Sequence, residues 1–146
     1  NGNKNSIAVD MGPDELIAEE PSDKPILNPY YEKIFSVKTY SLEEITAEKL
    51  RSLLQRTRVR DYYDVWYLLT KTKPDRKKVA KIFLQKADYK KLAFTGKAQL
   101  LHAEKLAQAE AYYHSQIGNQ LRNIPPFKKI SGELGEAIAE LDLEDR

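Results

Sequence analysis

The chain has 146 residues, which is enough for one domain with a substantial core. Hydrophobic residues make up 41% and charged residues 32%, as in folded globular proteins. The absence of cysteine excludes disulfides and thiolate zinc sites, and with only His102 and His114 we expect no metal site from this composition. No apolar run could span a membrane and no signal peptide is recognisable, so we expect a cytoplasmic protein.

The net charge of +2 is an average over three segments of opposite sign. Residues 1–48 carry 4 basic and 10 acidic side chains, and residues 98–146 carry 5 basic and 8 acidic ones. Residues 49–97 carry 15 basic and 4 acidic side chains, an excess of +11. Such a segregated basic block predicts an anionic partner for the middle third of the chain.

The first forty residues predict strands and loops. Short strands are expected at residues 6–11, at 24–28, where Pro25 restricts the strand to an edge, and at 34–40, where β-branched and aromatic residues alternate. Two or three strands make a poor sheet alone, so we expect its remaining strands upstream of Asn1. Residues 1–40 would then be the remnant of a larger core.

From residue 41 the pattern becomes helical. Ser41 and Glu44 have capping-box spacing and predict a helix from 42 to 55 or 56. Further helices are predicted at 61–70, at 76–86 after a cap at Asp75, at 97–121, and from 127 or 132 to 141 beyond Pro125-Pro126. The fold class is therefore α+β: a few N-terminal strands followed by a helical domain, residues 41–146, of about five helices.

The first predicted helix carries a lysine on its apolar face. At 100° per residue, Lys49 falls between Ile45 and Leu53, and Arg56 falls on the same face two turns after Lys49. A lysine on a buried stripe is costly unless it has a partner or reaches solvent. Position alone leaves open whether Lys49 reaches solvent at the edge of the stripe or has a function.

The next helix begins with two aspartates, Asp61 and Asp64, that project together away from its apolar face. They could pair with Lys49, Arg56 or Arg60, or bind a magnesium ion on a phosphate. The simpler interpretation is structural: Asp61 would be the N-cap and Asp64 would occupy the N3 position, where the helix dipole favours an acid.

The basic block continues along the third predicted helix, with Lys77, Lys78 and Lys81 followed by more lysines and interleaved aromatic residues. Basic and aromatic side chains along one helix suit a phosphate backbone and exposed bases. A solvated helix face is the commoner explanation of such a run. We take Lys77, Lys78 and Lys81 as candidate nucleic-acid contacts.

Three motifs in order resemble one known family: Ser-Leu-Glu-Glu at 41–44, Ala-Glu-Lys-Leu at 47–50, and Arg-x-x-x-Arg-Asp-x-Tyr-Asp at 56–64. The family is the abortive-infection AbiEii-type nucleotidyltransferases, the toxin half of bacterial and archaeal toxin–antitoxin pairs. The match is fairly specific over about thirty residues, and the helical remainder fits more loosely.

This resemblance implies transfer of nucleotides from a nucleoside triphosphate, with magnesium, to an RNA acceptor such as transfer RNA, and a cognate antitoxin as partner. It implies that Lys49 contacts the triphosphate, that Asp61 or Asp64 acts as a base or orients that lysine, and that Arg56 and Arg60 bind phosphate or have structural roles. The Gly-Ser and Asp-x-Asp motif of the family is not in this sequence. We expect it upstream, and we expect the chain to be inactive alone.

Two other hypotheses stand beside this one. The chain could be a non-enzymatic helical module that binds nucleic acid or a partner protein. Alternatively, Lys49, Arg56, Asp61 and Asp64 could form only a buried ion network between two helices. An open concave surface at these residues would favour the enzyme, and a closed core would favour the network.

Overall fold

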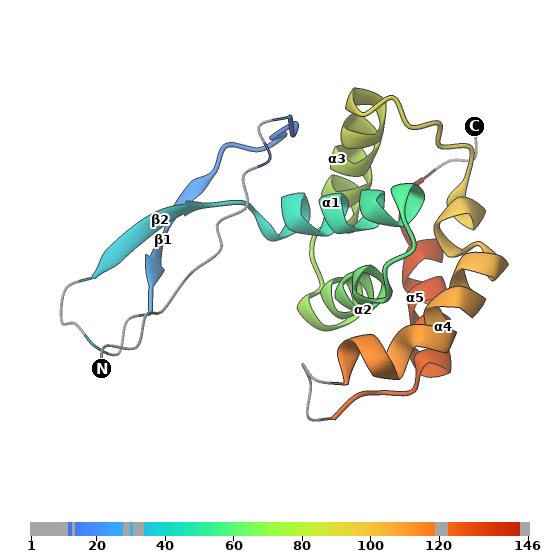
Figure 1. The fold of residues 1–146 in the computed structure, drawn as a ribbon. Helices are drawn as coiled ribbons and strands as arrows, with labels where there is room; N and C mark the ends of the chain where they lie inside the picture. Colours follow the sequence, from blue (N-terminus) through green and yellow to red (C-terminus); the bar gives the residue numbers. More distant parts are fainter. Residues whose placement is uncertain (1–11, 13, 28–29, 31–33, 119–122, 144–146) are drawn as a thin grey trace.

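The computed structural model describes residues 12, 14–27, 30, 34–118 and 123–143. In this part of the chain two antiparallel strands precede five α-helices (Figure 1), which confirms the predicted α+β class. The strand predicted at residues 6–11 lies outside the described residues. The elements are β1 (Ser22–Ile26), β2 (Phe35–Thr39), α1 (Leu42–Gln55), α2 (Val59–Tyr67), α3 (Arg76–Tyr89), α4 (Ala103–Ile117) and α5 (Phe127–Ala139).

Strands β1 and β2 form a hairpin that projects away from the helices (Figure 1). The register pairs Ser22 with Thr39 and Pro25 with Ser36, so Pro25 lies on an edge strand as predicted. Every residue of the two strands except Thr39 is exposed. The hairpin therefore contributes little to the core and leads directly into α1.

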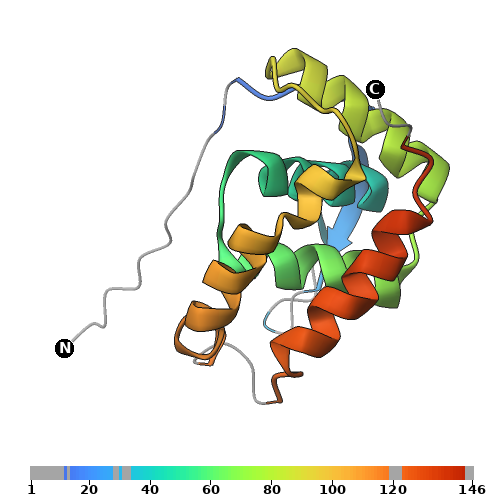
Figure 2. The same ribbon diagram turned by 90° about the vertical axis from the view of Figure 1, so that its right-hand side faces the viewer.

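Helix α1 is the centre of the helical part and lies between α3 on one side and α2 on the other (Figures 1 and 2). It begins at Ser41, whose Oγ accepts a hydrogen bond from the Glu44 amide at 3.0 Å, as the capping pattern predicted. Because α1 has neighbours on two sides, Ala47, Leu50 and Leu53 are fully buried.

Helices α2, α4 and α5 enclose the second half of the core. Tyr62 meets Phe127 edge to face at 6.2 Å between ring centroids, and Tyr113 packs on Phe127 at 5.2 Å. Such aromatic pairs bury large apolar areas with defined geometry. They join the start of α5 to α2 and α4, and thereby support the α2 surface that faces α1.

The helices predicted at 61–70 and 97–121 differ from those of the structure, in which α2 ends at Tyr67 and a π-helical turn, Leu68–Thr72, follows it. Helix α2 begins at Val59 rather than Asp61, because Arg58 is the N-cap residue and no side chain caps it. The predicted helix at 97–121 is divided into a 3-10 turn, Lys97–Leu101, and α4. The chain is extended at the intervening His102, and the turn places Leu100 fully inside the core.

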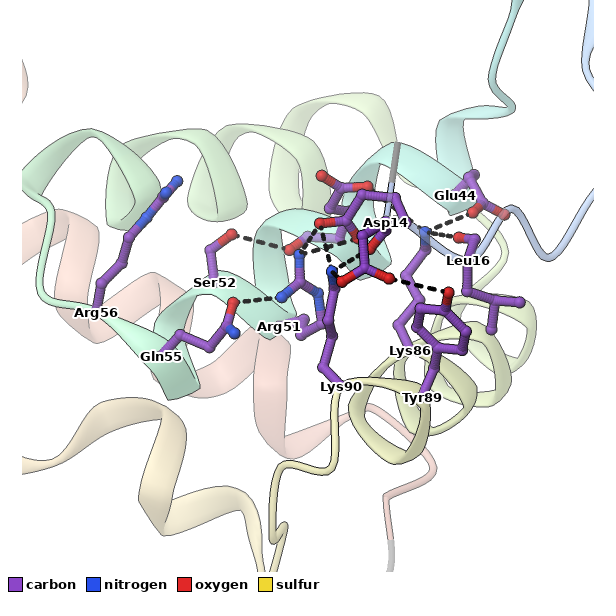
Figure 3. Close-up of polar contacts among 12 residues, drawn as sticks. Asp14, Leu16, Glu44, Arg51, Ser52, Gln55, Arg56, Lys86, Tyr89 and Lys90 are labelled. Atoms are coloured by element: carbon purple, nitrogen blue, oxygen red, sulfur yellow. Dashed lines mark hydrogen bonds and ion pairs between the residues drawn. The ribbon is translucent and has the colours of Figure 1, made fainter. Parts of the chain in front are cut away.

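A segment that we call the strap, residues 14–20, crosses α1 and α3 and is held mainly by charged side chains (Figure 3). Lys90 pairs with Asp14 at 3.3 Å, and Arg51 pairs with Glu15 at 3.2 Å. Part of the basic block is therefore engaged within the chain, since Lys78, Lys86 and Lys90 pair with acidic residues.

The strap is anchored on a buried ion pair. Lys86 Nζ lies 2.6 Å from Glu44 Oε1 and donates to the Leu16 carbonyl at 2.5 Å. The Glu44 carboxylate also accepts hydrogen bonds from the amides of Ala18 and Glu19, at 3.1 Å each. Glu44 therefore does not complete the capping box toward Ser41, and instead it connects the strap to α1 and α3.

Candidate functional site

Lys49 lies at the rim of the apolar face of α1 and not within it. Its side chain is 34% exposed, and Ile45, one turn earlier, is exposed as well. The predicted apolar stripe is buried at Leu53 but open to solvent at Ile45 and Lys49. This arrangement favours the interpretation that Lys49 reaches solvent, and it leaves the ammonium accessible.

The residues selected from the sequence motif form one ion network between α1 and α2. Lys49 Nζ donates to Asp64 Oδ2 at 2.7 Å and lies 3.8 Å from Asp61 Oδ1. The Arg56 guanidinium donates twice to the Asp61 carboxylate, from Nε at 2.7 Å and from Nη2 at 3.2 Å. The hydrogen bond to Asp61 raises the pKa of Arg56 and so favours the charged guanidinium.

Burial separates the roles of the two aspartates. The Asp61 side chain is almost completely buried, whereas Asp64 is partly exposed. Asp61 occupies the third position of α2, so the prediction that it is the N-cap and that Asp64 stands at N3 is wrong. Because Asp61 is buried and bound by two cations, its carboxylate fixes the end of α1 against the start of α2.

The network opens into a depression that we call the cationic cleft, with a volume of 560 Å³. Of the seven residues that line it, four are cationic and one is anionic. They come from α1, the connection to α2, the start of α2, and α4: Lys49, Arg56, Thr57, Arg58, Arg60, Asp61 and Gln116. The cleft brings together four predicted site residues and adds Arg58, Thr57 and Gln116, which the sequence motif did not single out.

The start of α2 adds to the positive potential of the cleft. Arg58, Arg60 and Asp61 lie at the first turn of this helix, and the N-cap residue Arg58 makes no side-chain capping hydrogen bond. Helix N-termini carry a partial positive charge and amide groups that can bind anions. The cleft therefore suits a ligand with several negative charges.

A second hollow, which we call the tyrosine pocket, adjoins the cleft. It has a volume of 470 Å³ and is lined by Ile45, Lys49, Tyr63, Asp64, Tyr67 and Leu68. Lys49 lines both cavities. The sequence offered one signal for the pocket, a tyrosine pair at i and i+4 on one helix face.

The three lysines predicted to contact nucleic acid are on α3, across α1 from α2 (Figures 1 and 2). Lys77 and Lys81 are exposed. Lys78 is exposed and pairs with Glu19 of the strap at 3.3 Å, an interaction that raises the pKa of Lys78. None of the three lines the cationic cleft.

The site aspartates do not form a metal centre in the described residues. These residues contain no group of three carboxylate or imidazole side chains placed to hold a metal ion. The oxygens of Asp61 and Asp64 accept hydrogen bonds from Arg56 and Lys49, which compete with a cation for the same lone pairs. Nor does the described part of the chain contain a helix long and apolar enough to cross a membrane.

Comparison with known proteins identifies the family. The family described as "Nucleotidyl transferase AbiEii toxin, Type IV TA system" matches residues 1–138. No curated protein and no solved structure gives a significant match. The family match covers both strands and most of the helical part, including the three motifs between residues 41 and 64. The chain therefore belongs to the AbiEii nucleotidyl transferase toxin family.

Proposed function

We propose that the cationic cleft binds the triphosphate of a nucleoside triphosphate and that the protein serves nucleotidyl transfer to an RNA acceptor, with transfer RNA as the first candidate. The observation that carries this proposal is the composition of the cleft, with four cationic side chains around the uncapped start of a helix. Phosphate groups are bound in proteins by this combination of Arg, Lys and backbone amides.

In this proposal Lys49 contacts the triphosphate. Asp64 orients Lys49, since the 2.7 Å hydrogen bond fixes the ammonium while a third of the lysine side chain stays exposed. Asp61 acts through Arg56, whose guanidinium it holds in a bidentate pair at the mouth of the cleft. Arg58 and Arg60 are exposed and would bind outer phosphate oxygens.

The reaction is a displacement at the α-phosphorus. A hydroxyl oxygen of the RNA acceptor forms the new P–O bond, the bond to the bridging oxygen of the β-phosphate breaks, and pyrophosphate leaves with its electron pair. The hydroxyl proton passes to solvent or to an acceptor base. Cations around the leaving phosphates stabilise the charge that develops on them. Lys49 and Arg56 are the side chains proposed for this task.

The family's nucleotidyl transferase activity also suggests a divalent metal. The described residues do not fit a magnesium site of their own, because both site aspartates are engaged by cationic side chains. The displacement above therefore relies on the cationic side chains of this chain and not on magnesium bound by it. A toxin–antitoxin family also implies a cognate antitoxin, which we include among the proposed partners.

Calorimetric titration with inorganic tripolyphosphate tests the cleft directly. We expect Lys49→Met to weaken binding about tenfold or more, because one charge-assisted contact is lost. Lys38→Met is the matched control, since Lys38 also pairs with an aspartate, Asp23, but on the projecting hairpin. Equal affinity of the wild type and the Lys49→Met variant would refute the assignment of Lys49.

Transfer of label from α-labelled nucleoside triphosphates to transfer RNA by the full-length protein, with the expected upstream motif, tests the acceptor. We expect transfer to be lost with Lys49→Ala and retained with Lys38→Ala. If tripolyphosphate binds normally but no labelled RNA forms, the RNA acceptor must be dropped from the proposal.

The alternative function, a non-enzymatic module that binds nucleic acid, rests on exposed Lys77 and Lys81 of α3. It predicts RNA binding that weakens steeply with salt and that Asp61→Asn leaves unchanged. Loss of RNA binding on charge removal at both lysines, with no triphosphate binding in the cleft, would favour this alternative.

A further inference from the structure

Helices α1 and α2 leave large hydrophobic side chains exposed at one place. Among the described residues, the large hydrophobic side chains that these two helices expose are Ile45 and Tyr67, and both line the tyrosine pocket. Tyr63 and Tyr67 present nearly parallel rings, with centroids 6.4 Å apart and planes inclined by 21°. Almost half of the Tyr67 surface is exposed, so packing in the core does not explain a large aromatic side chain at this position.

The position of Lys49 connects this pocket to the cationic cleft. Its ammonium lies 2.7 Å from Asp64, which lines the tyrosine pocket, and 3.8 Å from Asp61, which lines the cleft. A ligand that occupies both cavities passes Lys49 and needs a flat apolar part joined to a polyanionic part. The volume of 470 Å³ lies within the range of small-molecule sites.

We propose that the tyrosine pocket binds the nucleobase of the nucleoside triphosphate whose phosphates occupy the cationic cleft. This inference rests on the proposed function and assigns the base to Tyr63, Tyr67 and Ile45. Stacking on an aromatic ring tolerates every base, because each base has a π face. The pocket lining is mainly apolar, so it provides affinity for a base with few groups that select one base over another.

Trp66 is a built-in reporter of this pocket. It is the only tryptophan of the chain, and its ring centroid lies 5.3 Å from that of Tyr63 and 6.4 Å from that of Tyr67. The indole is buried and donates to Glu133 Oε2 at 2.7 Å, so it does not itself need to contact the ligand. Its fluorescence can therefore follow binding in the pocket, while calorimetry follows binding in the cleft.

The experiment compares inorganic tripolyphosphate with ATP, GTP, CTP and UTP on the same protein. Tripolyphosphate affinity tests the proposed function alone, and the gain in affinity on adding a nucleoside tests this inference. We expect at least one nucleotide to bind about tenfold tighter than tripolyphosphate, the effect of stacking one base. If all four nucleotides bind no tighter than tripolyphosphate, the pocket does not bind the base.

Tyr67→Ser should remove the gain in affinity of nucleotides over tripolyphosphate. It should leave tripolyphosphate affinity within about twofold of the wild type, since stacking and phosphate binding are separate contacts. Tyr67→Phe should retain the gain, because the ring and not the hydroxyl stacks. Tyr89→Ser is the matched control: Tyr89 is 48% exposed and Tyr67 is 47% exposed, but Tyr89 is on α3. A Tyr67→Ser variant that weakens tripolyphosphate as much as nucleotide would overturn the inference, as would a Tyr67→Phe variant that loses the gain.

A single-stranded RNA pentanucleotide distinguishes the acceptor's base from the nucleotide's base. If Tyr67→Ser weakens binding of the pentanucleotide but leaves the nucleotide gain intact, the pocket serves the RNA and the inference is wrong. If neither tripolyphosphate nor any nucleotide binds, the proposed function fails first and this inference fails with it.

Discussion

Glu44 and Lys86, from different helices, form an ion pair at 2.6 Å in which the side chains are only 1% and 2% exposed. The carboxylate has two further donors in the strap. The ammonium has the Leu16 carbonyl as another acceptor (Figure 3). A buried ion pair is tolerated when its remaining hydrogen-bonding capacity is satisfied. This pair therefore connects three segments, α1, α3 and the strap, at one point.

Removal of one partner of this pair should destabilise the protein severely. We expect Lys86→Met to lower the free energy of unfolding by about 3 kcal/mol, because Glu44 is left charged and buried. The double variant with Glu44→Gln should recover part of the loss. Urea denaturation measures both. Lys78→Met, which breaks an exposed strap pair, is the control and should leave the urea midpoint nearly unchanged. A Lys86→Met protein as stable as this control would contradict the role of the pair.

Acid should loosen the strap at Glu19. The hydrogen bond from Ser41 Oγ, 2.5 Å long, lowers the pKa of Glu19 below its ordinary value of 4.5, and Lys78 lowers it further. A lowered pKa in the folded state gives stability that is present above pH 4.5 and is lost as pH falls through the folded-state pKa. Glu19→Gln should reduce this loss in urea titrations at decreasing pH. Glu20→Gln, which alters an exposed neighbour, should retain the loss.

Tyr62 has a buried hydroxyl that finds no hydrogen-bond partner among the described residues. Tyr62→Phe should therefore leave the protein equally stable or more stable, since no bond is lost and a desolvated polar group is removed. Tyr113→Phe is the matched comparison, because the Tyr113 hydroxyl donates to the Pro125 carbonyl at 3.0 Å. We expect Tyr113→Phe to cost about 1 kcal/mol. The opposite order of stability would show that the Tyr62 hydroxyl has a partner.

The burial of Tyr62 also predicts that the folded protein becomes less stable at alkaline pH. Burial raises the pKa of Tyr62 from 10.0 to about 12, with a smaller contribution from Asp61. Between these values the unfolded chain releases the proton while the folded chain retains it, so stability falls as pH rises, by up to about 2 kcal/mol. Tyr62→Phe should make the decrease between pH 10 and 12 shallower in the same urea titrations.

Local signals in the sequence predicted what depends on local contacts. The caps at Ser41 and Asp75 accept hydrogen bonds from amides two or three residues ahead, and both helices begin where expected. The spacing between Lys49, Asp61 and Asp64 predicted a possible pairing, which the structure contains. The caps are visible because donor and acceptor are two or three residues apart, and the possible pairing is visible because Asp61 and Asp64 share one helix face.

Features that depend on distant partners were not predictable in this way. The pairing of Glu44 with Lys86 joins different helices, and nothing near Glu44 indicates that it is buried. Likewise no proline or glycine marks the break at His102, which arises because Leu100 turns into the core. The tyrosine pocket exists because the packing of α1 on α2 brings Ile45 and Tyr67 to one cavity, and helix periodicity alone does not give that packing.

Gly132 in α5 and Gly118 at the end of α4 give a test of how a methyl group is tolerated at a glycine. A methyl group added at Gly132 would meet no atom within 4 Å, so Gly132→Ala should stabilise the protein by about 0.5–1 kcal/mol through reduced backbone entropy of the unfolded chain. At Gly118, beyond α4, the added carbon would lie 2.5 Å from the His114 carbonyl oxygen. Gly118→Ala should therefore destabilise, and thermal melts of the two variants should shift in opposite directions.

The site network predicts different effects for its two aspartates. Asp61→Asn should lower the free energy of unfolding by about 2 kcal/mol, because a buried carboxylate that holds Arg56 in two hydrogen bonds is neutralised. Asp64→Asn should leave the urea midpoint almost unchanged, since Asp64 and its partner Lys49 are both partly exposed. Both variants should alter tripolyphosphate affinity, which calorimetry measures independently of stability. Equal destabilisation by the two substitutions would mean that Asp61 does not fix α1 against α2, and that the cleft keeps its shape without the Arg56 pair.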